Sequence, residues 1–304
     1  MSAVQLGQYP APGQTIVHLS DPHLLAGGAR LGGSIDCAAQ LPTTLAQVER
    51  SGLDVSALVF TGDLADLGEE EAYLALRAAV EPVADRLGAT VHWVMGNHDE
   101  RAPFRRHLLD DAGGDAPVDS VALSGGLRLI TLDSTVPGYH HGAVDDAQLE
   151  WLAGVLAEPA PEGSVLMMHH PPIPSPQPLF QLLELERQDR LARVLAGSDV
   201  RVILAGHLHY ASHASFAGIP VSVAAASCYT MNLAVPPERM NGMDGGRSYT
   251  LVHVYADTTV HQVVPVGDFA TWDTFDEAFI RRMEALDPSA RREAFSRKRP
   301  PASR

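Results

Sequence analysis

Val94-Met95-Gly96-Asn97-His98-Asp99 joins an apolar run to a group of polar side chains. The apolar residues from Val91 to Met95 predict a short buried strand, and the glycine lets the backbone turn and approach a ligand closely. Asn97 offers a neutral oxygen that suits a hard metal or a phosphate, and His98 can exchange a proton near neutral pH. Asp99 is placed to hold that imidazole in one orientation. On its own the stretch is equally typical of an ordinary turn, so its meaning depends on the rest of the chain.

Four other apolar runs end in the same kinds of side chain. The strands expected at Thr15–Leu19, Ala57–Phe60, Val165–Met168 and Val200–Leu204 lead into Asp21 and His23, Asp63, His169, and His207 and His209, respectively. In open α/β sheets, ligands bind beyond the carboxyl ends of the strands, so we expect these residues to converge on one crevice. Each residue also has an ordinary structural reading, such as a turn or a helix cap. The occurrence of all five groups at strand ends favours a site.

The candidate donors are two carboxylates, four imidazoles and one amide: Asp21, Asp63, His23, His169, His207, His209 and Asn97. This set is too large for one tetrahedral zinc ion with an open position, but it suits two first-row metal ions that share a bridging ligand. Nitrogen and oxygen donors without thiolate favour Mn, Fe, Zn or Co over Mg or Ca. Two ions about 3.5–4 Å apart are the usual device for displacement at a phosphoester. His98, beside Asn97, is the candidate general acid, a role that typically contributes about 10²–10⁴-fold to the rate.

The rest of the chain alternates between helix-like and strand-like segments. Helices are expected at Leu41–Arg50, Glu69–Leu87, Ala102–Leu109, Asp145–Leu156 and Leu182–Leu195, and further strands at Ser120–Leu123, Leu127–Leu132, Ile219–Ala224, Tyr249–Tyr255 and Val260–Val266. This alternation predicts an α/β sheet protein with a β-richer second half. We expect one catalytic domain over residues 1–268, followed by a mobile basic extension over 269–304 that contains two short helical patches.

Composition and charge limit the class of protein. The chain has 304 residues, of which 45% are hydrophobic, and it has no apolar run long enough to span a membrane. A polar N-terminus without a signal-like core predicts a cytoplasmic protein, in which Cys37 and Cys228 are free thiols; a single disulfide is the alternative. The net charge of −15 disfavours a nucleic-acid partner. The segment from Arg281 to Arg304 contains eight basic residues and three acidic ones. This end is expected to be a solvated tail, and electrostatic contact with an anionic membrane surface is the alternative.

Some further residues are candidates for the substrate side of the site. His140, His141 and His170 follow strands or lie in loops, so they are placed to line it. Tyr139-His140-His141 and Ser227-Cys228-Tyr229 are the candidate contacts to a nucleoside. His18, inside a strand, is expected to make a hydrogen bond in the core.

The motifs as a group resemble the five sequence blocks of the calcineurin-like metallophosphoesterases. The blocks are Asp21-Pro22-His23, Gly62-Asp63, Gly96-Asn97-His98-Asp99, His169 and Gly206-His207-Leu208-His209, in the family's order and at similar intervals. Within that family the chain is similar to the bacterial class III cyclic-nucleotide phosphodiesterases, which share runs such as Val59–Asp66, His169–Pro172 and Leu204–Tyr210. The resemblance extends over about Gln14 to Val266 and does not reach into the basic extension.

The resemblance implies a four-layer αββα sandwich with a dinuclear metal site at the carboxyl ends of its strands. Carried over by motif, one site holds Asp21, His23, Asp63 and His209, and the other holds Asp63, Asn97, His169 and His207. Asp63 would bridge the two ions. Family members often bind Fe and Mn, and several are homodimers. The residues expected to contact substrate are His23, Asp63, Asn97, His98, His209 and His140.

The resemblance also implies a reaction. A hydroxide that bridges the metals attacks phosphorus in line, while His98, oriented by Asp99, protonates the departing ribose oxygen and so converts 3′,5′-cyclic AMP to 5′-AMP. One alternative is a broader phosphoesterase that acts on 2′,3′-cyclic nucleotides, glycerophosphodiesters or phosphomonoesters. A second alternative is an envelope-associated regulator that acts through its basic tail.

Overall fold

The computed structural model describes residues 4–298, and contacts divide the chain into two units. The larger unit, Pro12–Gly267, is called the sandwich below. The smaller one, the terminal unit, combines Met1–Ala11 with Asp268–Arg304. The sequence-based division placed the first residues in the catalytic domain instead of grouping them with the C-terminal extension.

Two large sheets make up the centre of the sandwich. The first has the order β13-β12-β1-β2-β3, with β1 at Gln14–Leu19, β2 at Ala57–Thr61, β3 at Thr90–Val94, β12 at Ser248–Val254 and β13 at Thr259–Pro265. The second has the order β4-β5-β6-β7-β9-β8, with β4 at Ser120–Ser124, β5 at Leu127–Thr131, β6 at Ser164–Met167, β7 at Val200–Ala205, β8 at Ser212–Phe216 and β9 at Ile219–Val223. A small pair joins β10, Thr230–Met231, to β11, Gly242–Met243. Strands β1, β2 and β3 are parallel, as are β5, β6, β7 and β9, so within each sheet their carboxyl ends share one edge.

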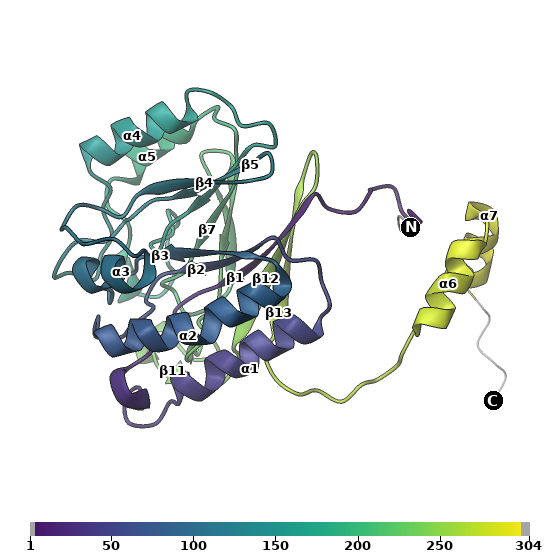
Figure 1. Cartoon of the computed structure of the whole chain (residues 1–304), viewed down its shortest axis with the longest axis horizontal. Coiled ribbons are helices and arrows are strands. Elements are labelled where there is room, and N and C mark those ends of the chain that lie inside the picture. Colours follow the sequence, from purple (N-terminus) through teal and green to yellow (C-terminus); the bar gives the residue numbers. More distant parts are fainter. Residues whose placement is uncertain (1–3, 299–304) are drawn as a thin grey trace. The chain divides into compact units, whose positions relative to one another are not determined.

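Helices cover the outer face of each sheet (Figure 1). Those of the sandwich are α1, Cys37–Arg50; α2, Glu70–Leu87; α3, Arg101–Leu108; α4, Asp146–Leu156; and α5, Gln188–Leu195, with short 3₁₀ turns η1 at Ala26–Gly28, η2 at Phe180–Leu183 and η3 at Pro237–Arg239. In Figure 1, α1 and α2 lie outside the first sheet, and α4 and α5 lie outside the second. The four-layer αββα prediction is therefore confirmed.

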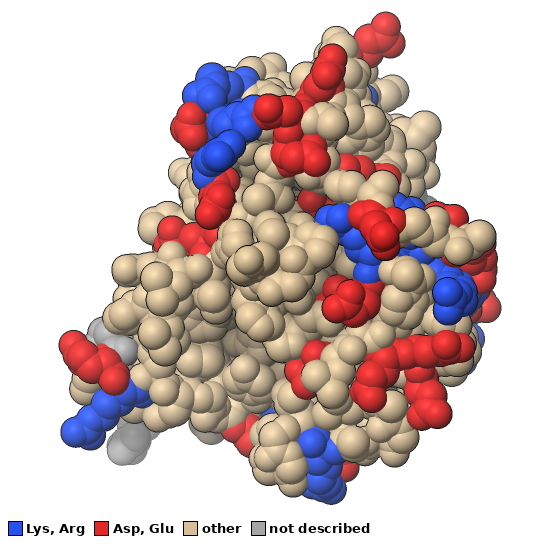
Figure 2. Space-filling model, turned by 90° about the vertical axis from the view of Figure 1, so that its left-hand side faces the viewer, with Lys and Arg blue, Asp and Glu red and all other residues tan. Residues whose placement is uncertain are grey.

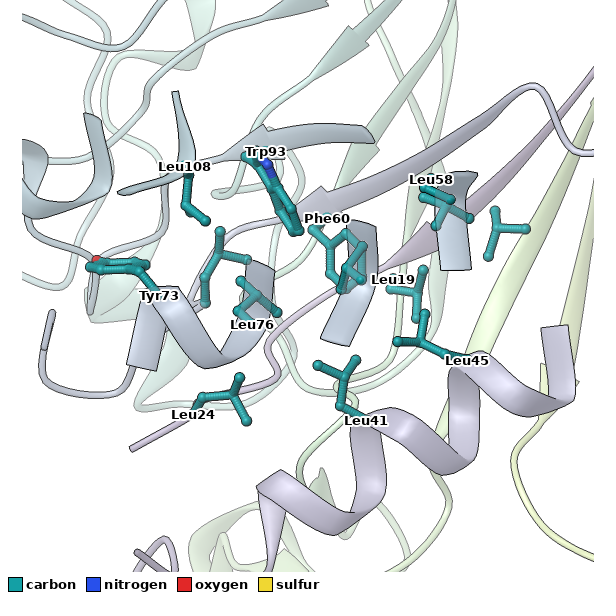
Figure 3. Close-up of a cluster of buried hydrophobic side chains, with 14 of the residues drawn as sticks. Leu19, Leu24, Leu41, Leu45, Leu58, Phe60, Tyr73, Leu76, Trp93 and Leu108 are labelled. Atoms are coloured by element: carbon teal, nitrogen blue, oxygen red, sulfur yellow. The ribbon is translucent and has the colours of Figure 1, made fainter. Parts of the chain in front are cut away.

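Alternation along the strands explains the layers. In β2, Leu58 and Phe60 pack toward the helices, whereas Ala57 and Val59 belong to the core between the two sheets. Successive side chains of a strand point to opposite faces, so a fully apolar strand buries both faces. Figure 3 shows the helix-facing side, where Leu41 of α1 and Phe60 belong to one buried cluster.

Two local predictions differ from the structure. The expected helix Leu182–Leu195 is interrupted, because the backbone near Leu185 pairs with Gly142 instead of continuing a helix, and α5 begins only after Arg187 with φ of 48°. Strand β8 was not predicted, because its exposed polar sequence lacks an apolar pattern. The capping box at Asp145 and Gln148 is confirmed at the start of α4.

The terminal unit contains helices α6, Glu277–Ala285, and α7, Pro288–Arg291, followed by one π turn, η4, at Arg292–Ser296. Phe275, Phe279 and Phe295 pack together with ring centroids 5.1–5.7 Å apart. The two expected helical patches are therefore present, whereas the end after Lys298, predicted to be mobile, lies outside the described residues. No helix in the described part of the chain combines the length and the apolar composition needed to cross a bilayer.

Candidate metal centre

The predicted donors come together at the carboxyl edge of the strands. Ligand atoms of Asp21, His23, Asp63 and His209 all lie within 4.8 Å of one another, and these four residues are buried. His169 adds Nε2 at 3.4 Å from Oδ2 of Asp63. Asp63 is therefore the carboxylate that lies near both halves of the cluster.

The remaining two donors lie on the His169 side. Oδ1 of Asn97 is 3.0 Å from Nε2 of His169. Ring nitrogens of His169, His170 and His207 lie within 4.8 Å of one another. All seven predicted donors thus belong to one cluster.

The backbone at the donors is strained. Five donor residues have φ between 45° and 71°, in the left-handed region that residues other than glycine rarely adopt: Asp21, His23, Asp63, His207 and His209. Such a conformation costs about 1–3 kcal/mol at each position and persists only where the surrounding structure holds it. Its concentration at five predicted donors indicates that the fold gives up stability to aim these side chains at one point.

Two motif glycines provide space for this convergence. A Cβ atom on Gly96 would collide with the backbone nitrogen and carboxylate of Asp63. On Gly206 it would collide with Ser20 and lie 2.7 Å from Oδ2 of Asp21. Both glycines therefore allow one strand end to approach the aspartate at the end of a neighbouring strand closely.

A second partner fixes the orientation of each donor imidazole. Nδ1 of His169 lies 2.7 Å from the carbonyl oxygen of Thr61, and Nδ1 of His209 lies 3.1 Å from that of Tyr229. In His207 it is Nε2 that lies 3.1 Å from a carbonyl oxygen, that of Leu183. Because one ring nitrogen is engaged in this way, the other is left to bind a metal, as is usual for metal-binding histidines.

His23 is oriented by a carboxylate. Its Nδ1 lies 2.8 Å from Oδ1 of Asp66, and its Nε2 lies 3.4 Å from Oδ2 of Asp63. That Nε2 is buried and has no hydrogen-bond partner among the described residues. A buried, unpaired polar atom is costly unless something binds it. The unpaired nitrogen and the mixed nitrogen and oxygen donors therefore fit transition metal ions at this position.

The charges of the cluster support the same conclusion. Burial opposes ionisation of His23, but the neighbouring carboxylates of Asp63 and Asp66 raise its pKa well above the usual value. Burial also opposes ionisation of His169, but the neighbouring carboxylate of Asp63 more than offsets this effect and raises the pKa of His169 to about 9. Burial lowers the pKa of His209 to about 4. The Asp63 carboxylate thus attracts positive charge, and a bound cation would displace the protons.

The structure corrects the role of Asp99. Its carboxylate accepts hydrogen bonds from the backbone N–H groups of Gly96, Leu64 and Ala65 and from the hydroxyl of Tyr73. The prediction that Asp99 orients His98 is therefore wrong, because these donors from the neighbouring loop and from α2 occupy the carboxylate.

His98 is instead held by Asp66. Nδ1 of His98 lies 2.8 Å from the carbonyl oxygen of Asp66 and 3.5 Å from its Oδ1. The backbone N–H of His98 donates to Oδ1 of Asp63 over 2.9 Å. This arrangement leaves Nε2 of a 30% exposed imidazole available for proton transfer beside the cluster.

A cavity of about 280 Å³ lies next to the donors. Its lining residues are His23, Leu31, Asp63, Asp66, Asn97, His98, His140, Phe180, Leu183, His207, His209 and Tyr229. Nδ1 of His140 lies 2.8 Å from Nδ2 of Asn97, so His140 is placed where the sequence predicted it.

The other candidate substrate contacts are less uniform. Tyr229 lines the cavity, whereas Tyr139 is 62% exposed and is not among the lining residues. His170 is buried and is not among the lining residues, and its ring nitrogens lie close to Oγ of Ser134 and the carbonyl oxygen of His140. His141 lies 3.8 Å from Glu186 and does not line the cavity either.

The family model for calcineurin-like phosphoesterases matches residues 14–211. The chain belongs to this family. The match spans the five motif blocks and both halves of the donor cluster.

Relatives of this phosphoesterase extend the match beyond the motifs. A cAMP/cGMP dual specificity phosphodiesterase of Mycobacterium tuberculosis is 52% identical over 275 residues, which cover 90% of this chain and 86% of the relative. A probable cyclic nucleotide phosphodiesterase of Rhodococcus erythropolis is also 52% identical, over 88% of this chain and 89% of the relative. The crystal structure of a dimetal phosphatase from Danio rerio shares the fold with a TM-score of 0.59 and 17% identity, and covers 84% of this chain and 98% of that one.

Sequence reasoning missed Asp66, Tyr73 and the apolar side of the cavity. Asp66 lies three residues after Asp63 on the same loop, so a second carboxylate at that spacing was the available signal. Phe180 and Leu183 gave no such signal, because Leu183 lay within the expected helix Leu182–Leu195 and Phe180 lay just before it.

Proposed function

We propose that this phosphoesterase is a metal-dependent phosphodiesterase that hydrolyses 3′,5′-cyclic nucleotides, with cyclic AMP converted to 5′-AMP. The observation that carries the proposal is the gathering of seven donor side chains from five strand ends beside one cavity. The 52% identical relatives, named for cyclic nucleotides, support the choice of substrate. The relative named for both cAMP and cGMP supports the inclusion of cyclic GMP.

The donors fall into two sets that share Asp63. Asp21, His23, Asp63 and His209 would hold one ion, and Asp63, Asn97, His169 and His207 would hold the other. When bound, two such ions supply positive charge that polarises the phosphoryl group and lowers the pKa of water.

The protein's own groups then bind the phosphate and move a proton. Nδ2 of Asn97 and the ring of His140, which lie together at the cavity, are placed to donate to phosphoryl oxygens. Hydrolysis breaks the bond between phosphorus and the ribose O3′, and that oxygen must gain a proton. His98 can supply it from Nε2, because Asp66 holds Nδ1 on the other side of the ring.

The experiment compares substrates on the Mn²⁺-loaded protein. Turnover of 3′,5′-cyclic AMP should exceed that of 2′,3′-cyclic AMP, of an aryl phosphodiester and of a phosphomonoester. Chelation and Asn97→Ala should each remove the activity, whereas His213→Ala, an exposed imidazole away from the cavity, should leave it. Preference for the monoester would overturn the proposal, and activity that survives both chelation and Asn97→Ala would contradict the two-metal site.

The chemistry of the donor atoms also bears on which metal ions the site binds. We propose Fe and Mn as the native pair, with Zn or Co as alternatives, because the donors are nitrogen and oxygen atoms without thiolate in the predicted sets. Metal analysis of protein purified without added metal tests this, and a content of Mg alone would contradict it.

We also propose a homodimer that works in the cytoplasm, with peripheral membrane contact through the basic extension as an added property. Eight basic residues from Arg281 to Arg304 support such a contact. Light scattering tests the dimer. Cell fractionation of a variant truncated after Phe269 tests the membrane contact, which an unchanged distribution would rule out.

A further inference from the structure

The cavity has two chemically different walls. The donor side is formed by imidazoles and carboxylates, whereas Leu31, Phe180, Leu183 and Tyr229 contribute apolar and aromatic surface. These four residues come from three separate loops, which lie after η1, in η2 and before β10. A phosphate uses only the polar wall. The apolar wall therefore needs an organic group of the substrate to cover it.

Turn η2 supplies two of these four residues. Phe180 and Leu183 are half-buried and line the cavity, whereas Leu179 and Leu182 of the same segment are 61% and 74% exposed. The ring of Phe180 lies edge-on to that of His207, with centroids 5.8 Å apart. The turn therefore places one aromatic ring directly beside a predicted metal ligand.

The segment is fixed to the sandwich at several points. Glu184 accepts a hydrogen bond from the backbone N–H of Ser175 through its carboxylate and from that of Gly142 through its carbonyl. The carbonyl oxygen of Leu183 lies 3.1 Å from Nε2 of His207. The backbone of Leu183 thus orients a donor imidazole while its side chain faces the cavity.

We propose that Phe180 and Leu183 form the subsite for the nucleoside and determine specificity for it, an inference that rests on the proposed cyclic-nucleotide activity. In this subsite, Phe180 packs against the face of the base, and Leu183 packs against the sugar of the same nucleoside. Stacking on an aromatic ring tolerates different bases, because every base has a π-face. A wall of this kind accepts adenine and guanine alike and disfavours substrates without a planar group.

Binding of the product separates this subsite from the metal centre. In calorimetry on the Mn²⁺-loaded protein, Phe180→Ala should weaken binding of 5′-AMP by about tenfold or more, the size expected for loss of one stacking contact. Binding of inorganic phosphate should not change, and neither should the metal content, because the carbonyl of Leu183 remains. Phe180→Trp should restore 5′-AMP binding.

Leu183→Ala and Leu182→Ala form a matched pair. They remove the same side chain from adjacent positions of one turn, but only Leu183 lines the cavity. KM for cyclic AMP should rise several-fold in Leu183→Ala and stay unchanged in Leu182→Ala, with kcat changed little in both. Equal effects of the two substitutions, or equal loss of phosphate and 5′-AMP binding in Phe180→Ala, would overturn the subsite.

The two levels of the proposal fail in different ways. If the unaltered protein does not hydrolyse cyclic AMP, the proposed function is wrong. If it does, and Phe180→Ala and Leu183→Ala leave KM and 5′-AMP affinity unchanged, only the subsite is wrong.

Discussion

Oδ1 of Asp66 lies 2.8 Å from Nδ1 of His23, whose other ring nitrogen faces the carboxylate of Asp63. A partner of this kind fixes the tautomer of a metal-binding imidazole and raises its basicity. Asp66 therefore supports the metal centre, although it is not one of the seven predicted donors.

Replacing Asp66 should weaken metal binding. We expect Asp66→Ala to lower the affinity for Mn²⁺ by about 10–100-fold, the usual effect of losing such a partner. Asp66→Asn should lose less, because its amide oxygen can still accept from Nδ1 of His23. Equilibrium dialysis against Mn²⁺ measures both, with the exposed Asp54→Ala as control. An affinity unchanged in Asp66→Ala would show that His23 is held without this carboxylate.

His98 is expected to act on the leaving group only. His98→Ala should reduce kcat for cyclic AMP by about 10²–10⁴-fold, because the ribose oxygen leaves as a poor alkoxide without its proton. The same substitution should affect a p-nitrophenyl phosphodiester far less, since nitrophenolate leaves without protonation. Parallel steady-state assays on the two substrates measure the difference. A proportional loss on both would assign His98 to substrate binding instead.

Asp99 should behave differently from His98, because its carboxylate fastens the loops after β2 and β3 to Tyr73. Tyr73→Phe should destabilise the protein by about 1–3 kcal/mol, since it removes one partner of a buried carboxylate. Asp99→Ala should lower the rates on cyclic AMP and on the p-nitrophenyl diester in equal proportion. Urea unfolding measures the first effect and kinetics the second. A loss confined to cyclic AMP would restore the direct role for Asp99 in orienting His98.

The gathering of the donor residues was predictable from the sequence because the signal is local. A buried strand, a turn residue and a donor lie within a few positions of one another, and the parallel strands β1, β2 and β3 bring their carboxyl ends to one edge. The alternation within β2 likewise determines its two packed faces.

The hydrogen-bond partners of the other site residues were not predictable in this way. The carboxylate of Asp99 is bound by Leu64, Ala65 and Tyr73, which lie 26–35 residues away in the sequence. A sequence pattern relates a loop residue only to its immediate neighbours, so it predicted that Asp99 orients the adjacent His98. The break before α5 has a similar origin, because the pairing of Leu185 with Gly142 overrides a helical pattern.

His18 should make stability depend on pH. It is fully buried in β1, its Nε2 is 2.8 Å from Oγ1 of Thr61, and burial lowers its pKa from 6.5 to about 3. The unfolded chain binds this proton near pH 6.5, and the folded chain does so only near pH 3. The stability contributed by neutral His18 is therefore present above pH 6.5 and is lost as the pH falls toward 3.

The slope of stability against pH measures this effect. Between pH 6 and 4.5, each proton that only the unfolded state binds lowers the free energy of unfolding by about 1.4 kcal/mol for every unit by which the pH falls. Other buried histidines titrate as well, so the comparison is between the unaltered protein and His18→Gln. Urea unfolding at a series of pH values gives the slope of unfolding free energy against pH. In the variant, this slope should correspond to about one fewer proton taken up on unfolding. Identical slopes would mean that His18 keeps the same protonation in both states.

Metal removal should destabilise the fold, because the strained backbone at Asp21, His23, Asp63, His207 and His209 aims donors at a shared position. An ion that binds only the folded state adds about 2.7 kcal/mol at a free concentration one hundred times its Kd. Chelation should therefore lower Tm, and added Mn²⁺ should restore it. In Asp63→Asn, which replaces the carboxylate nearest to both halves of the cluster, Tm should start lower and shift less on chelation. Calorimetric scans with and without chelator make the comparison. A Tm that chelation leaves unchanged in the unaltered protein would show that the strained loops are stable without metal.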